Sequence, residues 1–234
     1  MVLMFLWPNA AFAQVAWKGV YAGIDTGVGF KTKQFSTNDG WFGPTTFNGS
    51  VDPSVNIFGH GGYNFQVKRF VVGAEAGVGH LGYSGEMFYG PKQDTSATTE
   101  GGVAWTAMGR VGWVYRQVMP YFAAGVIGSQ NKASITDDCN SGGCGTEVGH
   151  GSGATTATRW ALAYGLQIAS SKKIAGRQWG VRIDWLQVDS TPIENVFQRD
   201  VTGSAVPGTI NVTNTVRTPL ANTLRIHFDI YLTK

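Results

Sequence analysis

Seven charged side chains lie within stretches of this sequence that alternate between apolar and other residues, and together they could form ion pairs. A guanidinium pairs with a carboxylate through two parallel hydrogen bonds, and such pairing offsets much of the cost of burying either charge. We expect the centre of this network at Glu75, Arg110, Arg182, Asp184 and Arg225. The full set holds both partners, Asp25, Glu75, Asp184 and Asp229 against Arg110, Arg182 and Arg225.

The remaining polar residues do not indicate catalytic chemistry. None of the four histidines has a serine beside an acid in the pattern of a nucleophile and its base. The glycine clusters at 59–62 and 151–153 are not followed by predicted helices, which argues against a phosphate-binding loop. We therefore expect no enzymatic activity and no cofactor. We interpret His60 and His227 as polar filling of the protein interior; the other two histidines are His80 and His150.

The first residues are typical of the second half of a secretory signal. An apolar run at 2–7 is broken by Pro8, and Ala11-Phe12-Ala13 has the small-residue pattern of a cleavage site. The positively charged leader that usually precedes such a run is missing. The alternative is a short buried strand. We expect residues 1–13 to be a partial signal peptide and residues 14–234 to be one exported domain.

Export bears on the two cysteines, Cys139 and Cys144, which flank the sequence Asn-Ser-Gly-Gly. In an exported protein, a close pair around a flexible turn predicts a small disulfide loop. Asp137, Asp138 and His150 lie nearby and raise the alternative of a metal site. The tetrahedral ligand set of zinc is incomplete there, and the spacing fits no zinc pattern. We expect a disulfide and no metal.

Strict alternation of apolar residues predicts that eight strands carry the charged side chains. Most of these strands reach about ten residues, the length with which a tilted strand crosses a bilayer. Residues 118–129 are small and apolar on both faces, so the phase of that strand stays open. Short connections lie near Lys68, near Arg116 and at 170–177, and long polar connections lie at 31–53, 82–101, 130–156 and 188–217.

Eight alternating strands fit either a soluble lipocalin-type barrel or a membrane barrel, and three observations favour the membrane. The strands carry few charges and no central lysine, whereas a water-facing sheet would carry more. Glycines share the charged face and leave room for long side chains in a narrow lumen. On the apolar face, aromatic residues lie toward strand ends, as in the girdles at lipid–water interfaces: Tyr63, Trp105, Trp113, Tyr115, Trp160, Trp179 and Trp185.

The opposite arrangement, with the charged face of each strand toward lipid, is excluded by its energetic cost. Each arginine that faces lipid at the membrane midplane costs roughly 2–4 kcal/mol, and three strands carry one. We therefore expect an all-β fold, an eight-stranded antiparallel up-and-down transmembrane β-barrel. It would have short periplasmic turns, four long extracellular loops and the charge network in its lumen.

Four short motifs also make the sequence similar to a known family. Trp17–Gly23 matches the W-x-G-x-Y-x-G opening of its first strand, and Val72–Glu75 resembles its third strand. Arg110–Trp113 resembles the fourth strand, and Met119-Pro120-Tyr121 followed by Gly125 resembles the fifth. In this order the motifs resemble the small outer-membrane β-barrel proteins of alphaproteobacteria. These form the immunogenic porin-family group, related in fold to OmpA and the opacity proteins.

The resemblance implies a surface antigen in the cell outer membrane of a Gram-negative bacterium. Its implied partners are outer-membrane lipid, lipopolysaccharide and the barrel-assembly machinery, and its loops could bind a host surface or a small ligand. No nucleic-acid partner is expected, because the net charge is only +3 and the basic residues are scattered.

The barrel size decides between the functional hypotheses. An eight-stranded barrel is just wide enough for its own side chains to fill, so a wide diffusion pore is not expected. The first hypothesis is a structural component of the cell envelope. The second is a narrow channel gated by the arginine–carboxylate network, and the third is adhesion or ligand binding by loops such as 130–156. A lipid-modifying enzyme is the least favoured.

Overall fold

The protein is a set of antiparallel strands joined by turns. The computed structural model describes residues 17–29, 34–52, 54–90, 93–137, 148–189, 191–202, 208–216 and 222–232. Within these ranges one 3-10 turn, η1 (Gly40–Phe42), accompanies the strands, and no helix is both long and apolar enough to cross a membrane. The strands are β1 (Gly19–Gly29), β2 (Gln34–Asp39), β3 (Thr46–Val51), β4 (Ser54–Val67), β5 (Phe70–Leu81), β6 (Ser84–Tyr89), β7 (Thr95–Trp113), β8 (Val118–Asp137), β9 (Val148–Ile174), β10 (Arg177–Val188), β11 (Ile193–Thr202), β12 (Gly208–Val216) and β13 (Asn222–Tyr231). The predicted all-β antiparallel fold is confirmed.

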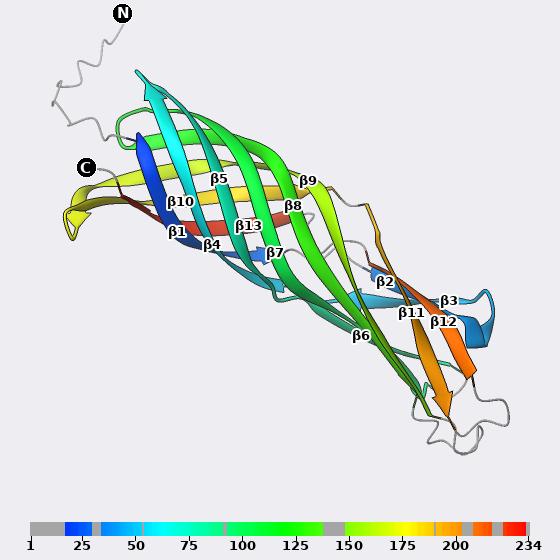
Figure 1. Ribbon diagram of the computed structural model, residues 1–234. Coiled ribbons are helices and arrows are strands. Elements are labelled where there is room, and N and C mark those ends of the chain that lie inside the picture. The colour runs from blue at the N-terminus through cyan, green and yellow to red at the C-terminus, as the bar shows by residue number, and fades with distance from the viewer. Residues whose placement is uncertain are drawn as a thin grey trace, which may run out of the picture.

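Eight of these strands form what we call the main group. β1 pairs with β4 on one side and with β13 on the other. From β4 the pairing continues through β5, β7, β8, β9 and β10, and β10 pairs with β13. Figure 1 shows these strands inclined to a common axis around an interior.

The remaining strands form a distal group together with the far ends of β7, β8 and β9. β6 pairs with β7, and the pairing runs on through β3, β2, β12 and β11 to β9. The distal group extends away from the main group at one end (Figure 1). The long connections predicted from the sequence are therefore largely strands wherever they are described. Burial alternates along these strands, for example in β6, where Met87 and Tyr89 are buried and Ser84, Glu86 and Phe88 are exposed.

Three tight turns close the opposite end of the main group. Lys68, Arg116 and Ala175 have positive φ angles of 51°, 58° and 49°. Short hairpin turns use positive φ because their twist then matches that of the flanking strands. The start of β1 lies at this same end, because Gly19 pairs with Asn64 near the end of β4, and the end of β13 lies beside it, because Tyr21 pairs with Tyr231.

The two faces of the main group differ sharply. Its outer face is apolar and exposed, with Ile24 at 65% and Val78 at 60%. The phase of β8, left open by the sequence, places Tyr121 inside and Phe122 outside. Inside, one apolar cluster lies next to the tight turns, and a second extends into the distal group. Along β5, the polar Glu75 lies between Val71 of the first cluster and Leu81 of the second.

Candidate functional site

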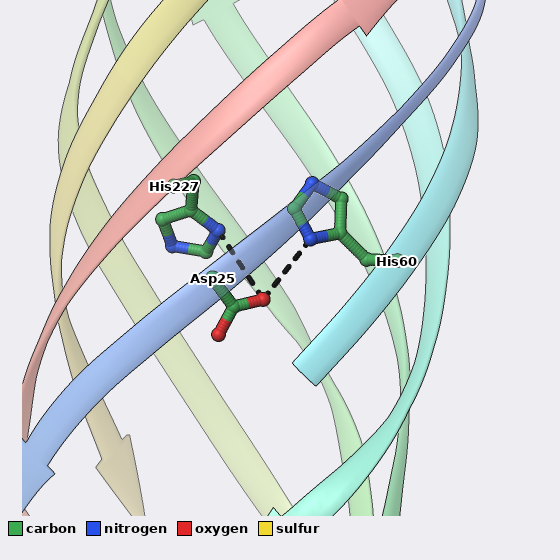
Figure 2. A group of neighbouring side chains, drawn as sticks. All are labelled: Asp25, His60 and His227. Carbon is green, nitrogen blue, oxygen red and sulfur yellow. Dashed lines mark hydrogen bonds and ion pairs between the residues drawn. The ribbon is translucent and has the colours of Figure 1, made fainter. Parts of the chain in front are cut away.

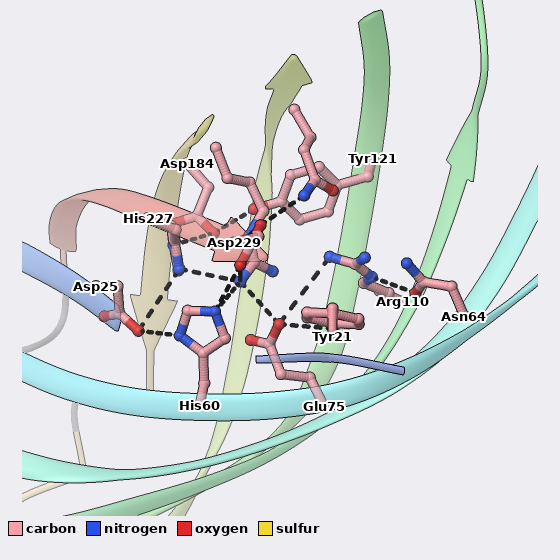
Figure 3. A network of polar contacts seen from close by, with 12 residues as sticks. Tyr21, Asp25, His60, Asn64, Glu75, Arg110, Tyr121, Asp184, His227 and Asp229 are labelled. Atoms are coloured by element: carbon pink, nitrogen blue, oxygen red, sulfur yellow. Dashed lines mark hydrogen bonds and ion pairs between the residues drawn. The ribbon is translucent and has the colours of Figure 1, made fainter. Parts of the chain in front are cut away.

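The interior of the main group contains a network of buried charges, drawn in Figure 3. Arg182 makes contacts with four of its members and is its central residue. The Arg182 guanidinium nitrogen Nη2 lies 2.7 Å from Glu75 Oε2, and its Nε lies 3.3 Å from Asp229 Oδ2. Glu75 belongs to β5 and Asp229 to β13, so one arginine on β10 connects three strands.

The second pair of the network is Asp184 with Arg225. These residues are direct cross-strand partners on β10 and β13. Arg225 donates from Nε to Asp184 Oδ1 and from Nη2 to Asp184 Oδ2, each at 2.8 Å. This is the bidentate geometry expected of a strong arginine–carboxylate pair. The Tyr121 hydroxyl also donates to Asp184 Oδ2.

Arg110 is held mainly by neutral groups. Its Nε donates to Asn64 Oδ1 at 3.0 Å, and its guanidinium carbon lies 4.6 Å from the centre of the Tyr21 ring. Its Nη1 lies 4.0 Å from Glu75 Oε2, at the limit of an ion pair. The Tyr21 hydroxyl donates to the same Glu75 oxygen at 2.8 Å. The guanidinium groups of Arg110 and Arg182 therefore both lie near Glu75 Oε2.

Two histidines complete the network, and sequence reasoning had treated them as filling. His60 Nδ1 lies 3.0 Å from Asp25 Oδ2, and His60 Nε2 lies 2.6 Å from Asp229 Oδ1. His227 Nε2 lies 3.2 Å from Asp184 Oδ2, and its Nδ1 lies 3.5 Å from Asp25 Oδ2. All seven charged residues singled out in the sequence thus meet in one network. The potential ligand atoms of Asp25, His60 and His227 lie within 4.8 Å of one another, so this group could hold a metal ion.

Sequence reasoning also missed four neutral partners: Tyr21, Asn64, Tyr121 and Gln167. Their inward parity was a signal that could have found Tyr21, Asn64 and Gln167. Tyr121 gave no such signal, because the phase of its strand was open.

Glycines on the inner face give the network its room. A Cβ atom built on Gly23 would lie 2.6 Å from His60 Nε2 and 2.9 Å from Asp229 Oδ1. A Cβ atom on Gly62 would lie 2.5 Å from the Tyr21 hydroxyl. Both distances are far shorter than van der Waals contact, so larger residues would displace the polar side chains.

The aromatic residues proposed as girdles lie on the outer face, and five of the seven are exposed. Trp160 is the most exposed, at 73%, whereas Trp179 and Trp185 are half-buried. Tyr63, Trp113, Tyr115 and Trp179 lie close in sequence to the tight turns, and Trp105, Trp160 and Trp185 lie farther along their strands.

Several predicted features lie outside the described residues. Cys139 and Cys144, the predicted disulfide, fall there, as does the proposed signal at 1–13. Asp138, from the alternative metal set with Asp137 and His150, also falls there.

Antiparallel strands with an apolar outer face and ion pairs inside define the class of outer-membrane β-barrel proteins. Residues 1–211 match the family model described as "Outer membrane protein beta-barrel domain", and the chain belongs to this family. This match confirms the resemblance predicted from the strand motifs, and it places the protein in the outer membrane of a Gram-negative bacterium.

Two curated relatives and one solved structure agree with this family. The 25 kDa outer-membrane immunogenic protein of Brucella ovis is 32% identical over 126 residues, which cover 53% of this chain and 54% of the relative. The protein of the same name from Brucella abortus is 32% identical over 126 residues, covering 53% of this chain and 51% of the relative. The chain thus spans about half the length of the curated relatives it matches. OprG from Pseudomonas aeruginosa shares the fold, with a TM-score of 0.51 at 10% identity, covering 92% of this chain and 95% of that one.

Proposed function

We propose that the main group closes into an eight-stranded barrel that spans the outer membrane. The unbroken series of pairings from β1 through β4 and β10 to β13 and back to β1 supports closure. The apolar outer face supports contact with lipid. Barrels of this class have short periplasmic turns and long extracellular connections. The tight turns therefore lie in the periplasm and the distal group outside the cell, with residues 14–234 forming one domain after removal of 1–13.

We further propose that the barrel is a structural, surface-exposed component of the envelope, and one observation carries this proposal. The interior is occupied by its own side chains, with Arg182, Asp184, His227 and Asp229 at most 2% exposed. An eight-stranded barrel is just wide enough for such filling. The apolar clusters on either side of the charged layer add two further barriers to water and ions.

The distal group supports the same proposal, because its interior is also packed. Phe35, Val51, Val212 and Val216 are at most 1% exposed and belong to a common apolar cluster. The buried Tyr83 hydroxyl donates to Asn131 at 2.8 Å. Burial raises the pKa of Tyr83, so the phenol stays protonated and keeps this bond. A packed extension of this kind suits a rigid surface structure.

Conductance in planar lipid bilayers tests the structural role against the narrow-channel alternative. We expect the wild-type protein to show no stable single-channel steps, because buried side chains fill the charged layer. The variants Glu75→Ala and Arg110→Ala remove parts of that layer, and Lys173→Ala at the exposed end of β9 serves as the control. Steps in the wild type that change in Glu75→Ala but not in Lys173→Ala would replace the structural role with a gated channel.

We also propose that the distal group contacts the saccharide of lipopolysaccharide after the assembly machinery has inserted the barrel. A groove of about 380 Å³ supports this proposal, since hydroxyls and a cation line it beside one carboxylate: Thr98, Ser134, Ser152, Lys132 and Glu100. Hydroxyls and an amine suit a sugar that carries phosphate groups. The groove lies on the distal ends of β7, β8 and β9, within and beside the loop 130–156 singled out for ligand binding.

The charge of Lys132 provides the test of this contact. We expect Lys132→Glu to lower the amount of lipopolysaccharide that copurifies with the folded barrel severalfold, because a carboxylate repels phosphate. Lys132 lies on β8 in the groove, whereas Lys173→Glu makes the same charge change at the tight-turn end of β9 and should have no effect. Equal retention by the two variants would contradict a role for the groove.

A further inference from the structure

We propose that Asp25, His60 and His227 form a binding site for one divalent transition-metal ion of the zinc class inside the barrel. All three side chains are buried, and one potential ligand atom from each lies within 4.8 Å of the others. Figure 2 shows both imidazole rings turned toward one oxygen of Asp25. This site adds a binding function to the structural role proposed above.

Neighbouring strands bring the three ligands together. Asp25 on β1 is the direct cross-strand partner of His227 on β13. On the other side of β1, His60 of β4 pairs with Gly23, whose missing side chain leaves space for the His60 ring. The site therefore bridges β4, β1 and β13, including the contact between the first and the last strand of the main group.

Two of the three distances between the ligand atoms are close to those of a tetrahedral zinc site, and the third is at most 4.8 Å. Asp25 Oδ2 lies 3.0 Å from His60 Nδ1 and 3.5 Å from His227 Nδ1. Zinc binds nitrogen and carboxylate oxygen at about 2.0–2.2 Å, so tetrahedral ligand atoms lie roughly 3.3–3.6 Å apart. Shifts of a few tenths of an ångström would complete these two edges. Two imidazoles and one carboxylate leave a fourth position for water.

The second nitrogen of each ring has the partner that metal-binding histidines usually have. His60 Nε2 lies 2.6 Å from Asp229 Oδ1, and His227 Nε2 lies 3.2 Å from Asp184 Oδ2. A carboxylate at this position holds the ring proton on Nε2 and leaves the Nδ1 lone pair free for a metal. Both Nδ1 atoms then face Asp25 Oδ2, and the other carboxylate oxygen, Oδ1, is buried without a hydrogen-bond partner. The two Nδ1 lone pairs and the carboxylate oxygen of Asp25 are all acceptors, so a cation between them would be stabilising.

The charge balance of the network points in the same direction. Four carboxylates, from Asp25, Glu75, Asp184 and Asp229, face three guanidiniums, from Arg110, Arg182 and Arg225. One positive charge is missing with neutral histidines, and an uncompensated buried charge is costly. A divalent ion at Asp25 supplies two positive charges, and with hydroxide as its fourth ligand the network would be neutral. Arg182 Nη2, which lies 3.1 Å from His227 Nδ1, would give up that contact and keep its 2.7 Å ion pair with Glu75.

Metal content after refolding tests the site. The full chain is refolded into detergent with zinc chloride, freed of unbound metal by gel filtration and analysed by mass spectrometry for zinc. We expect about one zinc per folded chain, because binding that accompanies folding contributes to the free energy of folding. Refolding with cobalt should give the visible absorption bands of tetrahedral cobalt. A folded wild type that carries no zinc and no such bands would overturn the proposal.

Variants locate the metal. Asp25→Asn and His227→Gln should each lower bound zinc at least tenfold, whereas His80→Gln, at an exposed histidine on β5, should retain it. The different gel mobilities of heated and unheated samples report whether each variant is folded. Zinc that persists in folded Asp25→Asn and His227→Gln would overturn the site, and if both variants fail to fold, the cobalt spectrum of the wild type decides. A nitrogen NMR spectrum of the zinc-refolded wild type with protons on both nitrogens of His60 would show a proton in place of the metal, which also overturns the proposal.

Discussion

Arg182 is the residue on which most of the buried contacts converge. Its guanidinium reaches Glu75 and Asp229 and lies 3.1 Å from a nitrogen of both His60 and His227. Replacing an entire buried ion pair by apolar residues is often neutral, but removing one partner leaves the other charge buried and unpaired. Arg182 therefore contributes to stability mainly by compensating the buried charges of Glu75 and Asp229, and less through the energy of any single hydrogen bond.

The variant Arg182→Met should destabilise the barrel by about 3–5 kcal/mol, because Glu75 and Asp229 would both lose their closest cation. Denaturant unfolding in detergent, followed by the mobility difference between folded and unfolded protein, measures this change. The control is Lys173→Met at an exposed position, which should shift stability by less than about 0.5 kcal/mol. Equal stabilities of the two variants would mean that the network contributes nothing to folding.

At the scale of strands, alternation was a reliable guide wherever the two faces differ strongly. Alternation places Val20, Ile24 and Val28 on one face of β1, and all three are exposed, whereas Asp25 on the other face is buried. The same period could not fix β8, because small apolar residues occupy both of its faces. In that strand the choice is made by packing, since Tyr121 reaches Asp184 from the inside.

The distal strands were missed because their pattern is weak and interrupted. β7 has a register shift between Gly101 and Ala104, and both Gly101 and Gly102 are buried. Such a bulge breaks the period of two, so the sequence pattern assigns residues up to 101 to a long connection and not to this strand. The meeting of Asp25 with both histidines was unpredictable for a different reason. It depends on which strands are neighbours, which alternation within each strand does not reveal.

At the scale of the whole molecule, the interior changes character along its axis. An apolar cluster at the tight turns is followed by the charged layer and then by the larger apolar cluster of the distal group. The outer face changes in the opposite sense. On β7, Val103 and Trp105 are exposed on the side of the main group, whereas the exposed Glu100 follows beyond the bulge. The bulge therefore lies where an apolar outer face gives way to a polar one.

This change of outer face predicts how the molecule responds to a new charge. Ile24 on the main group and Phe88 on the distal group are almost equally exposed, at 65% and 60%. Ile24→Arg should cost about 2–4 kcal/mol, because it places a guanidinium in lipid near the middle of β1. Phe88→Arg should change stability by less than about 0.5 kcal/mol, because that side chain faces water.

Unfolding of both variants in lipid vesicles measures the difference, and the pair serves as its own control, since the substitution is matched in exposure and in the residue introduced. A large loss for Phe88→Arg with none for Ile24→Arg would place the distal group in the membrane and contradict the proposal that the main group spans it. Similar losses would mean that lipid covers both groups, which the exposed Glu86 and Lys132 on the distal strands argue against. The exposed fractions of the two side chains are nearly equal and alone predict equal losses of stability. A difference in stability would therefore reflect whether lipid or water surrounds each side chain.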